Sequence, residues 1–273
     1  MKKVKRKLLG VEIDELKRSE VVAKLSEWVE SGGRAKVVVT VYSEFLVMAG
    51  EDKEFKRALN KADLKVVDGA LMLGGLRYQE MNEHGGWLFG HGLRVGWQGL
   101  RGRNGETVTG VWLFETLVEK AAEEGWRVFL LGGFGETAKK LEEKLKGRYP
   151  GLEIASDAGE QRVGEDGEEN RRVVKKVNEF KPDLLMVAYG PGKQEKWMIE
   201  NRRKLKTKVM MGLGGTFDEV LGLVSKSPEW MDRMGLRWLW RLVQQPKRLK
   251  RIYRGVVVCP WKLYREEMEK YRK

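Results

Sequence analysis

Residues 182–195 read PDLLMVAYGPGKQE, an apolar run that stops at a glycine-bearing turn. The run Leu184–Ala188 is too short for a membrane span and is bounded by turn residues, so it predicts a buried strand. The turn Gly190-Pro191-Gly192 follows. Lys193, Gln194 and Glu195 stand at its exit, where a helix is expected to begin.

Residues 208–220, KVMMGLGGTFDEV, repeat this arrangement. Glycines at a strand-to-helix turn let backbone N–H groups approach an anion, and the helix N-terminus adds a positive dipole end. Neither turn fits GxxxxGK[ST] or a full GxGxxG, so phosphate binding and a plain structural turn both stay open. The residues concerned are the strand Val209–Met211, then Gly212, Gly214, Gly215, Thr216 and Asp218.

Strand-like runs at 36–39, 64–67 and 127–131 are each followed by a helical pattern. This alternation predicts an α/β fold: a Rossmann-like, mainly parallel sheet flanked by helices on both faces. Ligands of such sheets bind at the carboxyl ends of the strands. The residues at these predicted ends, which together nominate one site, are Thr40, Asp68, Gly132, Gly190 and Gly214.

Residues 78–106 break the alternation, since they are rich in glycine, contain Trp87 and Trp97, and hold no steady period. They are interpreted as a mobile lid, an interaction loop or an ordered insertion. We divide the chain into an α/β catalytic core, residues 1–223, and a basic, Trp-rich helical C-terminal appendage, residues 224–273.

The appendage interleaves aromatic and basic residues. Trp230, Met234, Trp238 and Arg241 lie at helical spacing, and Pro246 interrupts the pattern. A helix with Trp and Leu on one face and Arg and Lys on the other suits a membrane interface. Alternatively, the tryptophans pack on the core, or bases of single-stranded nucleic acid stack on them. No RNP, KH or zinc-finger pattern supports the nucleic-acid interpretation.

Charge points to an anionic partner. The net charge is +13, and residues 226–273 carry 14 Lys and Arg against 5 Asp and Glu. Phosphate, nucleic acid and acidic lipid are the candidate partners. The single Cys259 excludes an internal disulfide and fits a reducing compartment. His84 and His91 have no Cys partners nearby, so no metal site is expected.

The N-terminus MKKVKRKLLG lacks the hydrophobic region of a signal peptide. No apolar stretch has the length of a spanning helix, and we therefore expect a soluble or peripheral protein. Asp68 follows two valines and precedes a glycine, a position that exposes a carboxylate at a strand end. It is a candidate general base, with Thr40 and Gln194 close enough to hold a substrate hydroxyl or phosphate. The alternative is a structural Asp-Gly turn.

Taken together, VVDG, RVFLLGG, GPGKQEKW, GGTFD and GLRWLWRLVQQPKR resemble the WecG/TagA/CpsF glycosyltransferases, family 26, over about residues 8–255. The resemblance implies transfer of a sugar, typically N-acetylmannosamine or its uronic acid, from a UDP donor. The implied acceptor is an undecaprenyl-diphosphate-linked sugar at the cytoplasmic membrane face, in polysaccharide or teichoic acid synthesis. It also implies inversion, no required metal ion and no cofactor.

The resemblance also assigns site residues. It implies that Asp68 is the base, with Thr40 and Gln194 beside it. The residues implied to bind the substrate or its UDP group are Gly132, Gly133, Gly190, Lys193, Glu195, Gly214, Gly215, Asp218 and, at the sugar-site position, Tyr42. The arginines implied to neutralise the diphosphate of donor or lipid carrier are Arg241, Arg248 and Arg251.

Three positions depart from the family pattern. Tyr42 replaces an asparagine, Thr107 an arginine and Trp112 an aspartate, and the segment 78–106 doubles the usual spacing. Either the sugar differs, Arg94 or Arg101 substitutes, or catalysis is weakened. A UDP-sugar transferase, peripheral at the inner face of the cell membrane, is the leading hypothesis. A catalytically weakened relative that binds nucleotide sugar or lipid carrier is the first alternative. A nucleic-acid-binding protein comes next, and homo-oligomerisation stays open.

Overall fold

The structure is a computed structural model that describes residues 5–83, 85, 87–133, 135–160, 163–164 and 167–272. Within this part of the chain lies one eight-stranded sheet with the order β1-β2-β4-β3-β8-β7-β5-β6. The β1–β2 pair is antiparallel and the other pairs are parallel. The strands are β1 (Lys5–Leu8), β2 (Val11–Asp14), β3 (Lys36–Val41), β4 (Leu64–Val67), β5 (Val128–Gly132), β6 (Ile154–Asp157), β7 (Leu184–Ala188) and β8 (Val209–Gly212).

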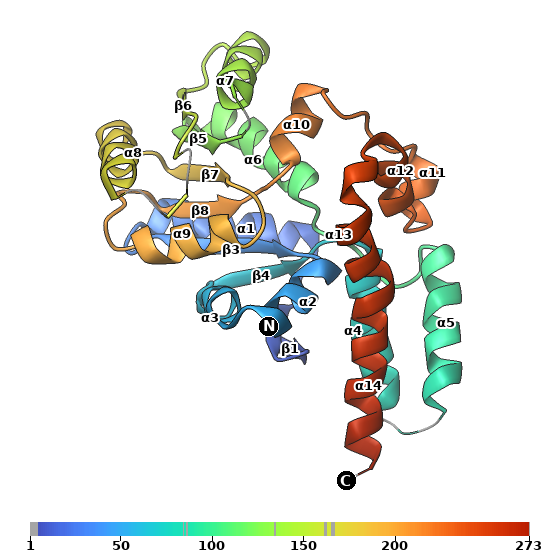
Figure 1. Cartoon of the computed structure of the whole chain (residues 1–273). Coiled ribbons are helices and arrows are strands. Elements are labelled where there is room, and N and C mark those ends of the chain that lie inside the picture. Colours follow the sequence, from blue (N-terminus) through green and yellow to red (C-terminus); the bar gives the residue numbers. More distant parts are fainter. Residues whose placement is uncertain are drawn as a thin grey trace.

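Helices cover both faces of this sheet (Figure 1). The helices of the first two thirds of the chain are α1 (Arg18–Ser31), α2 (Ser43–Glu51), α3 (Lys53–Lys61), α4 (Ala70–Asn82), α5 (Leu88–Leu100), α6 (Gly110–Glu124), α7 (Thr137–Arg148) and α8 (Gly167–Phe180). The later ones are α9 (Lys193–Asn201), α10 (Thr216–Leu221), α11 (Glu229–Arg233), α12 (Arg237–Gln244), η1 (Pro246–Arg248), α13 (Leu249–Tyr253), the π-helical η2 (Arg254–Val258) and α14 (Cys259–Tyr271).

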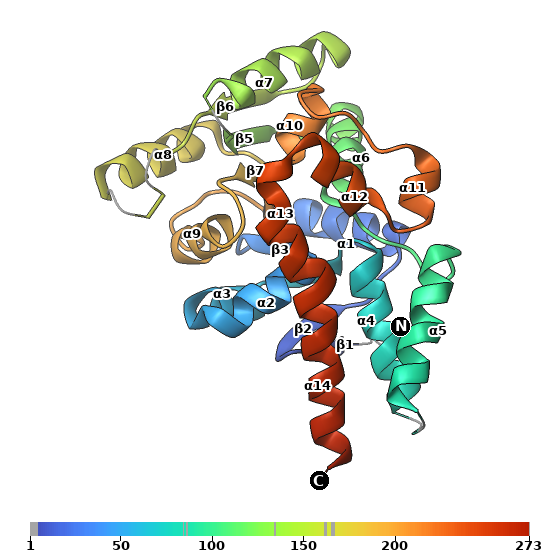
Figure 2. The same cartoon turned by 45° about the vertical axis from the view of Figure 1, so that its right-hand side comes forward.

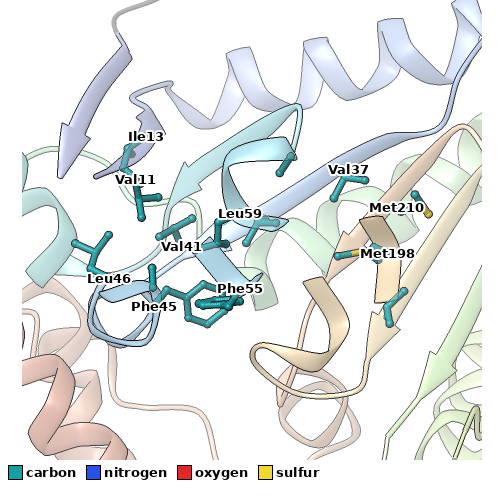
Figure 3. Packing of buried hydrophobic residues seen from close by; sticks show 14 of the residues in the cluster. Val11, Ile13, Val37, Val41, Phe45, Leu46, Phe55, Leu59, Met198 and Met210 are labelled. Atoms are coloured by element: carbon teal, nitrogen blue, oxygen red, sulfur yellow. The ribbon is translucent and has the colours of Figure 1, made fainter. Parts of the chain in front are cut away.

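Strand alternation divides the core into two layers. Val37 and Val39 pack into the cluster that contains Phe45 of α2 and Met198 of α9, whereas Val38 packs into the opposite cluster with α1, α6 and α7. Figure 3 shows the first cluster, with Val37, Phe45 and Met198 among its side chains. Successive strand residues point to opposite faces, so strands buried on both sides are continuously apolar. The predicted α/β fold class is confirmed.

Sequence patterns placed some elements better than others. The predicted strands 64–67 and 184–188 have the observed bounds, and the strand predicted at 36–39 extends to Val41, so Thr40 lies inside it. Strands β1, β2 and β6 were not predicted. Segment 78–106, which had no steady period, contains the helix α5.

The single helical period proposed for the appendage is wrong. Gly235 adopts a left-handed φ of 71° and ends the turn after α11, so Trp230 and Trp238 lie on separate helices. Pro246 begins η1, because a residue without an N–H is tolerated in a first helical turn. No helix in the described part of the chain has the length and apolar content needed to cross a bilayer.

The C-terminal helices run past one edge of the sheet and pack beside α2 and α4 (Figures 1 and 2). Cys259 and Leu263 of α14 belong to the same buried cluster as Phe45. Gly255 lies against the start of α2, where a Cβ on this glycine would come within 2.7 Å of Ser43 Oγ. The division into residues 1–223 and 224–273 stays a prediction, but these contacts tie the two parts together.

We predict that Gly255→Leu loosens the C-terminal helices, because the new side chain displaces η2 from α2. Overpacking of this kind costs about 1–3 kcal/mol. Limited trypsin digestion is expected to cleave the variant after Arg251 and Arg254 about tenfold faster than the wild type. Gly147→Leu is the matched control, since a Cβ there meets nothing within 4 Å. Equal cleavage of both variants would contradict the docking role of Gly255.

Candidate active site

A cleft of about 1050 Å³ opens at the carboxyl edge of the sheet. Its floor comes from the ends of β3, β4 and β8, and its roof from α11, α12 and the helices up to η2. Residues far apart in the chain therefore share one space. The predicted site residues that line it are Thr40, Tyr42, Asp68, Gln194, Gly214, Gly215, Arg241, Arg248 and Arg251.

Asp68 lies on the cleft floor directly after β4. Its Oδ2 accepts a hydrogen bond of 3.2 Å from the N–H of Gly110, the first residue of α6. Burial raises the pKa of the Asp68 carboxyl, although Arg237, the Gly110 N–H and Arg241 act in the opposite direction. The carboxylate is thus a stronger base than an aspartate in water, and it is already held in a fixed position.

Two hydroxyls meet beside this carboxylate. A Cβ on Gly110 would come within 2.9 Å of Thr216 Oγ1 and 3.6 Å of Thr40 Oγ1. Only glycine leaves that space free, so Thr40 and Thr216 can both face the start of α6. Thr40 and Thr216 are both buried. The arrangement offers a base and two hydroxyls to one substrate group.

The Gln194 side chain ties two glycine turns together. Its Oε1 accepts a 3.0 Å hydrogen bond from the Gly214 N–H, and its Nε2 donates to Glu195 Oε1 over 2.7 Å. Glu195 Oε2 in turn accepts from the Gly192 N–H at 2.7 Å. This bridge requires glycine at 212, where a Cβ would lie 2.7 Å from Gln194 Nε2. The protein itself therefore engages both ends of the Gln194 amide.

Three arginines form the roof of the cleft. A Cβ on Gly215 would lie 3.0 Å from Arg248 Nη2 and 3.8 Å from Arg241 Nη1, so both guanidiniums approach the second glycine turn. Burial, followed by the neighbouring Arg248, lowers the pKa of Arg241 to about 10. Burial and Arg251 likewise lower the pKa of Arg248. Like charges held this close favour an anion between them.

Carboxylates hold two of these arginines in place. Glu219 of α10 pairs with Arg241 and with Arg237. Glu44 pairs with Arg251 at 3.0 Å, and the Tyr42 hydroxyl accepts from Arg251 Nη2 at 2.6 Å. Among the described residues, Arg248 has no acidic partner within ion-pair distance. Its guanidinium is therefore available to a ligand.

Tyr42, one of the three departures, belongs to the anchor of the C-terminal helices. Its ring packs on Phe45 with centroids 4.3 Å apart. Burial raises the pKa of the phenol, so it stays neutral and keeps its hydroxyl hydrogen. Tyr42 thereby links Arg251 to the wall of the cleft.

The other two positions that depart from the family pattern, Thr107 and Trp112, both contact Arg18. Arg18 was not predicted from the sequence. Its guanidinium lies 4.7 Å from the centroid of the Trp112 ring, and its Nε donates to the Thr107 carbonyl at 2.9 Å. All three line the cleft. No local motif marks Arg18, because its partners are some 90 residues away. Of the proposed substitutes, Arg101 lines the cleft, whereas Arg94 is exposed on α5.

Several predicted residues lie outside the cleft lining. Asp218 lines a separate hollow of about 430 Å³ together with Thr137 of α7. Gly133 reaches the same region, since a Cβ there would lie 3.1 Å from the Thr137 Cβ. Lys193 is exposed to solvent. The full set outside the cleft is Gly132, Gly133, Gly190, Lys193, Glu195 and Asp218.

Of the two histidines, His84 lies outside the described residues, and His91 contacts Asn82 Oδ1 through Nδ1 at 2.6 Å. Within the described ranges, no three His, Cys, Asp or Glu side chains are grouped to hold a metal ion.

Together, the fold and the cleft define an α/β protein that binds its ligand at the carboxyl edge of a parallel sheet, beneath a cationic roof. The model of the Glycosyl transferase WecG/TagA/CpsF family matches residues 6–84 and 88–273, and the chain belongs to that family. Membership implies glycosyltransferase activity in cell-surface polysaccharide synthesis. Its general partners are a sugar nucleotide and a lipid-linked acceptor.

Burial raises the pKa of the Glu195 carboxyl to about 7, although hydrogen bonds from Gln194 and from the Gly192 N–H act in the opposite direction. The stability of the protein should therefore depend on pH. An unfolded glutamate ionises near 4.5, so the folded state binds more protons between the two values. The free energy of unfolding should therefore fall by roughly 1–3 kcal/mol from pH 4.5 to 7 on account of this group.

Urea unfolding at several pH values measures this slope, with Glu195→Gln for comparison. The variant lacks the titrating carboxyl and is expected to show a shallower slope, whatever its absolute stability. Identical slopes would mean that Glu195 ionises at an ordinary pH.

Proposed function

We propose that the chain is an inverting glycosyltransferase that moves a hexose of the N-acetylmannosamine type, or a related hexose, from a UDP-sugar to a polyprenyl-diphosphate-linked acceptor. The observation that carries this proposal is the pairing of one carboxylate with a cationic roof in a single cleft. Asp68 lies on the floor, and Arg241 and Arg248 face Gly215 from above. A base and a diphosphate site are what a single displacement requires.

Asp68 serves as the general base in this proposal. The acceptor hydroxyl oxygen attacks the anomeric carbon while its proton passes to the Asp68 carboxylate. The bond from that carbon to the UDP oxygen breaks, and UDP departs with the electron pair. Attack from the face opposite UDP inverts the anomeric centre. Thr40 and Thr216 lie beside the Gly110 amide that holds Asp68, and they orient the sugar or acceptor hydroxyls.

Arginines stabilise the departing UDP. Arg248 has no carboxylate partner in the described part of the chain, and Arg241 shares Glu219 with Arg237. Both are therefore able to take the charge that develops on the diphosphate. We expect the N–H groups of the second glycine turn to assist, with no metal ion required. The UDP-side role of Asp218 and Gly133 belongs to the same proposal, through the hollow next to α10.

The acceptor places the reaction at a membrane. We propose a peripheral protein at the inner face of the cell membrane, in polysaccharide or teichoic acid synthesis. We assign the sugar to the side of the cleft that contains Tyr42, Thr107 and Trp112, the three positions that depart from the family pattern. Arg18 adds a guanidinium on that side. We therefore expect a donor that makes polar contacts to Arg18 instead of to an asparagine and an aspartate.

A second candidate function is supported by the contacts of Tyr42 and Gln194. The Tyr42 hydroxyl and the Gln194 amide are both engaged by protein groups, Arg251 in one case and Gly214 and Glu195 in the other. A relative with weakened catalysis would bind nucleotide sugar or lipid carrier without turnover. UDP binding in calorimetry, combined with no UDP release from any donor and acceptor, would favour it.

We predict that Asp68→Asn lowers kcat by about 10²–10⁴ because the amide cannot accept the proton. UDP affinity should change little. UDP release from a panel of UDP-sugars with a short-chain polyprenyl-diphosphate glycan measures this. In the wild type, activity should fall as pH drops through a value above the ordinary aspartate pKa of 3.8, since burial raises the pKa of Asp68.

Asp52→Asn is the matched control for this experiment. Asp52 caps α3 by accepting the N–H groups of Glu54 and Phe55, and asparagine caps helices equally well. The control should retain full turnover. Turnover of Asp68→Asn equal to that of the control would remove Asp68 from the base role.

We predict that Arg248→Gln weakens UDP binding about tenfold to a hundredfold, the effect of losing a charge-assisted hydrogen bond. Isothermal titration calorimetry with UDP measures the loss. Arg265→Gln is the control, since this exposed α14 residue pairs only with Glu269, at 3.5 Å, among the contacts the structure describes. Unchanged affinity in Arg248→Gln would place the diphosphate elsewhere.

A further inference from the structure

Helix α5 carries apolar side chains on the face that turns away from the protein. Its inner face rests on α4, where Val95 is buried and packs against Gly74, and His91 contacts Asn82. Its outer face is exposed: Leu93 retains 59% of its accessible surface and Trp97 58%. We call this set the outer face of α5; its members are Trp87, Phe89, Leu93, Trp97 and Leu100.

These side chains form one stripe. Positions 89, 93, 97 and 100 follow one another at intervals of four, four and three residues, so they lie along one side of a helix. Trp87 precedes the helix and packs on Phe89 with ring centroids 5.7 Å apart. A soluble surface rarely leaves so many large apolar residues contiguous, and such a patch marks an interaction site.

The composition of α5 is unfavourable for a helix. The helix contains Gly90, Gly92, Gly96 and Gly99, and each interior glycine costs about 0.5–1 kcal/mol relative to alanine. Val95 is its single buried side chain among the described residues. A partner on the outer face would therefore stabilise the helix further.

Charge identifies the partner. Residues 85–105 contain no Asp or Glu, but they include Arg94, Arg101 and Arg103. Arg94 is exposed, and the Arg101 guanidinium stacks 4.5 Å from the Trp97 centroid. Tryptophan and arginine side by side suit the headgroup region of a bilayer, where the ring is half immersed and the cation meets anionic lipid. A protein partner would have to provide every acidic group that pairs with these arginines.

The stripe also leads to the cleft. Arg101 and Arg103, directly after α5, line the cleft. A Cβ on Gly102 would come within 3.0 Å of the Arg233 carbonyl oxygen, so the end of α5 abuts α11, which carries the exposed Trp230. Figure 2 shows α5 and α11 on the same side of the molecule.

We propose that the outer face of α5 docks on an anionic lipid bilayer, separately from the C-terminal helices, and sets the cleft mouth at the headgroup level. Arg101 and Arg103 would then lie between bilayer and cleft, on the route of a lipid-linked diphosphate. This route rests on the proposed function, whereas the docking does not. Within segment 78–106, the outer face of α5 is accordingly the membrane-binding element.

Flotation of the full chain with vesicles of phosphatidylglycerol and phosphatidylcholine tests the docking. Leu93→Gln/Trp97→Gln is expected to lower the vesicle partition coefficient at least about tenfold. Leu223→Gln is the control, because Leu223 is 66% exposed but lies after α10, remote from α5. The wild-type chain is also expected to lose binding when the vesicles contain phosphatidylcholine alone. Equal partitioning of the double variant and the control would overturn the proposal.

Hydrogen exchange gives a second readout in the wild-type chain. The amides of residues 88–100 should exchange more slowly on the anionic vesicles than in solution. If exchange is unchanged on vesicles, and residues 88–100 are protected only as protein concentration rises, the face is a homodimer contact and the docking is wrong.

Transfer to a short-chain, water-soluble acceptor separates the two proposals. The α5 double variant should retain this activity, since neither substituted residue lines the cleft. Vesicle binding that depends on α5, without UDP release from any donor, would overturn the proposed function alone. Transfer activity with vesicle binding insensitive to α5 would overturn the docking alone.

Discussion

Parallel pairing of β3 with β4 on one side and β8 on the other is the constraint on which the cleft depends. The pairs Thr40↔Val66 and Val39↔Gly212 bring the ends of all three strands to the same edge. Asp68 and the second glycine turn then follow from adjacent strands. A shift of one residue would turn Thr40 to the other face of the sheet and separate it from Gly110. Strand register thus positions Asp68, the Thr40 hydroxyl and the second glycine turn relative to one another.

Local patterns were sufficient for the centre of this sheet. Leu184–Ala188 is an apolar run between turn residues, and Leu64–Val67 is apolar except for the buried Lys65, in keeping with strands that are buried on both faces. The edges were harder to predict. Strand β1 reads KRKL and β6 reads IASD, and such short polar strands are held by a single neighbour and by position. Helix α5 was also hard to predict, because its four glycines disfavour a helix.

The candidate site likewise contains residues that could be predicted from the sequence and residues that could not. Asp68 and the second glycine turn directly follow strands, and Thr40 is the last residue but one of β3, so topology predicts that they meet. The contact of Arg251 with Glu44 spans 207 positions, and that of Arg18 with Thr107 spans 89. No period or spacing encodes such pairs, because they depend on where whole helices pack. Family resemblance suggested the C-terminal arginines, but only packing reveals that Tyr42, an unusual residue in that pattern, holds one of them.

The late position of these arginines in the chain has a consequence for biosynthesis. The strands that form the cleft floor are translated before Arg251 of α13, which anchors the roof to Glu44 and Tyr42. Domains fold largely in the order of synthesis. Until α12, η1 and α13 have been translated, a nascent chain therefore lacks the three arginines of the cleft roof. An anion that requires Arg241, Arg248 and Arg251 can be bound only after α12, η1 and α13 have been translated.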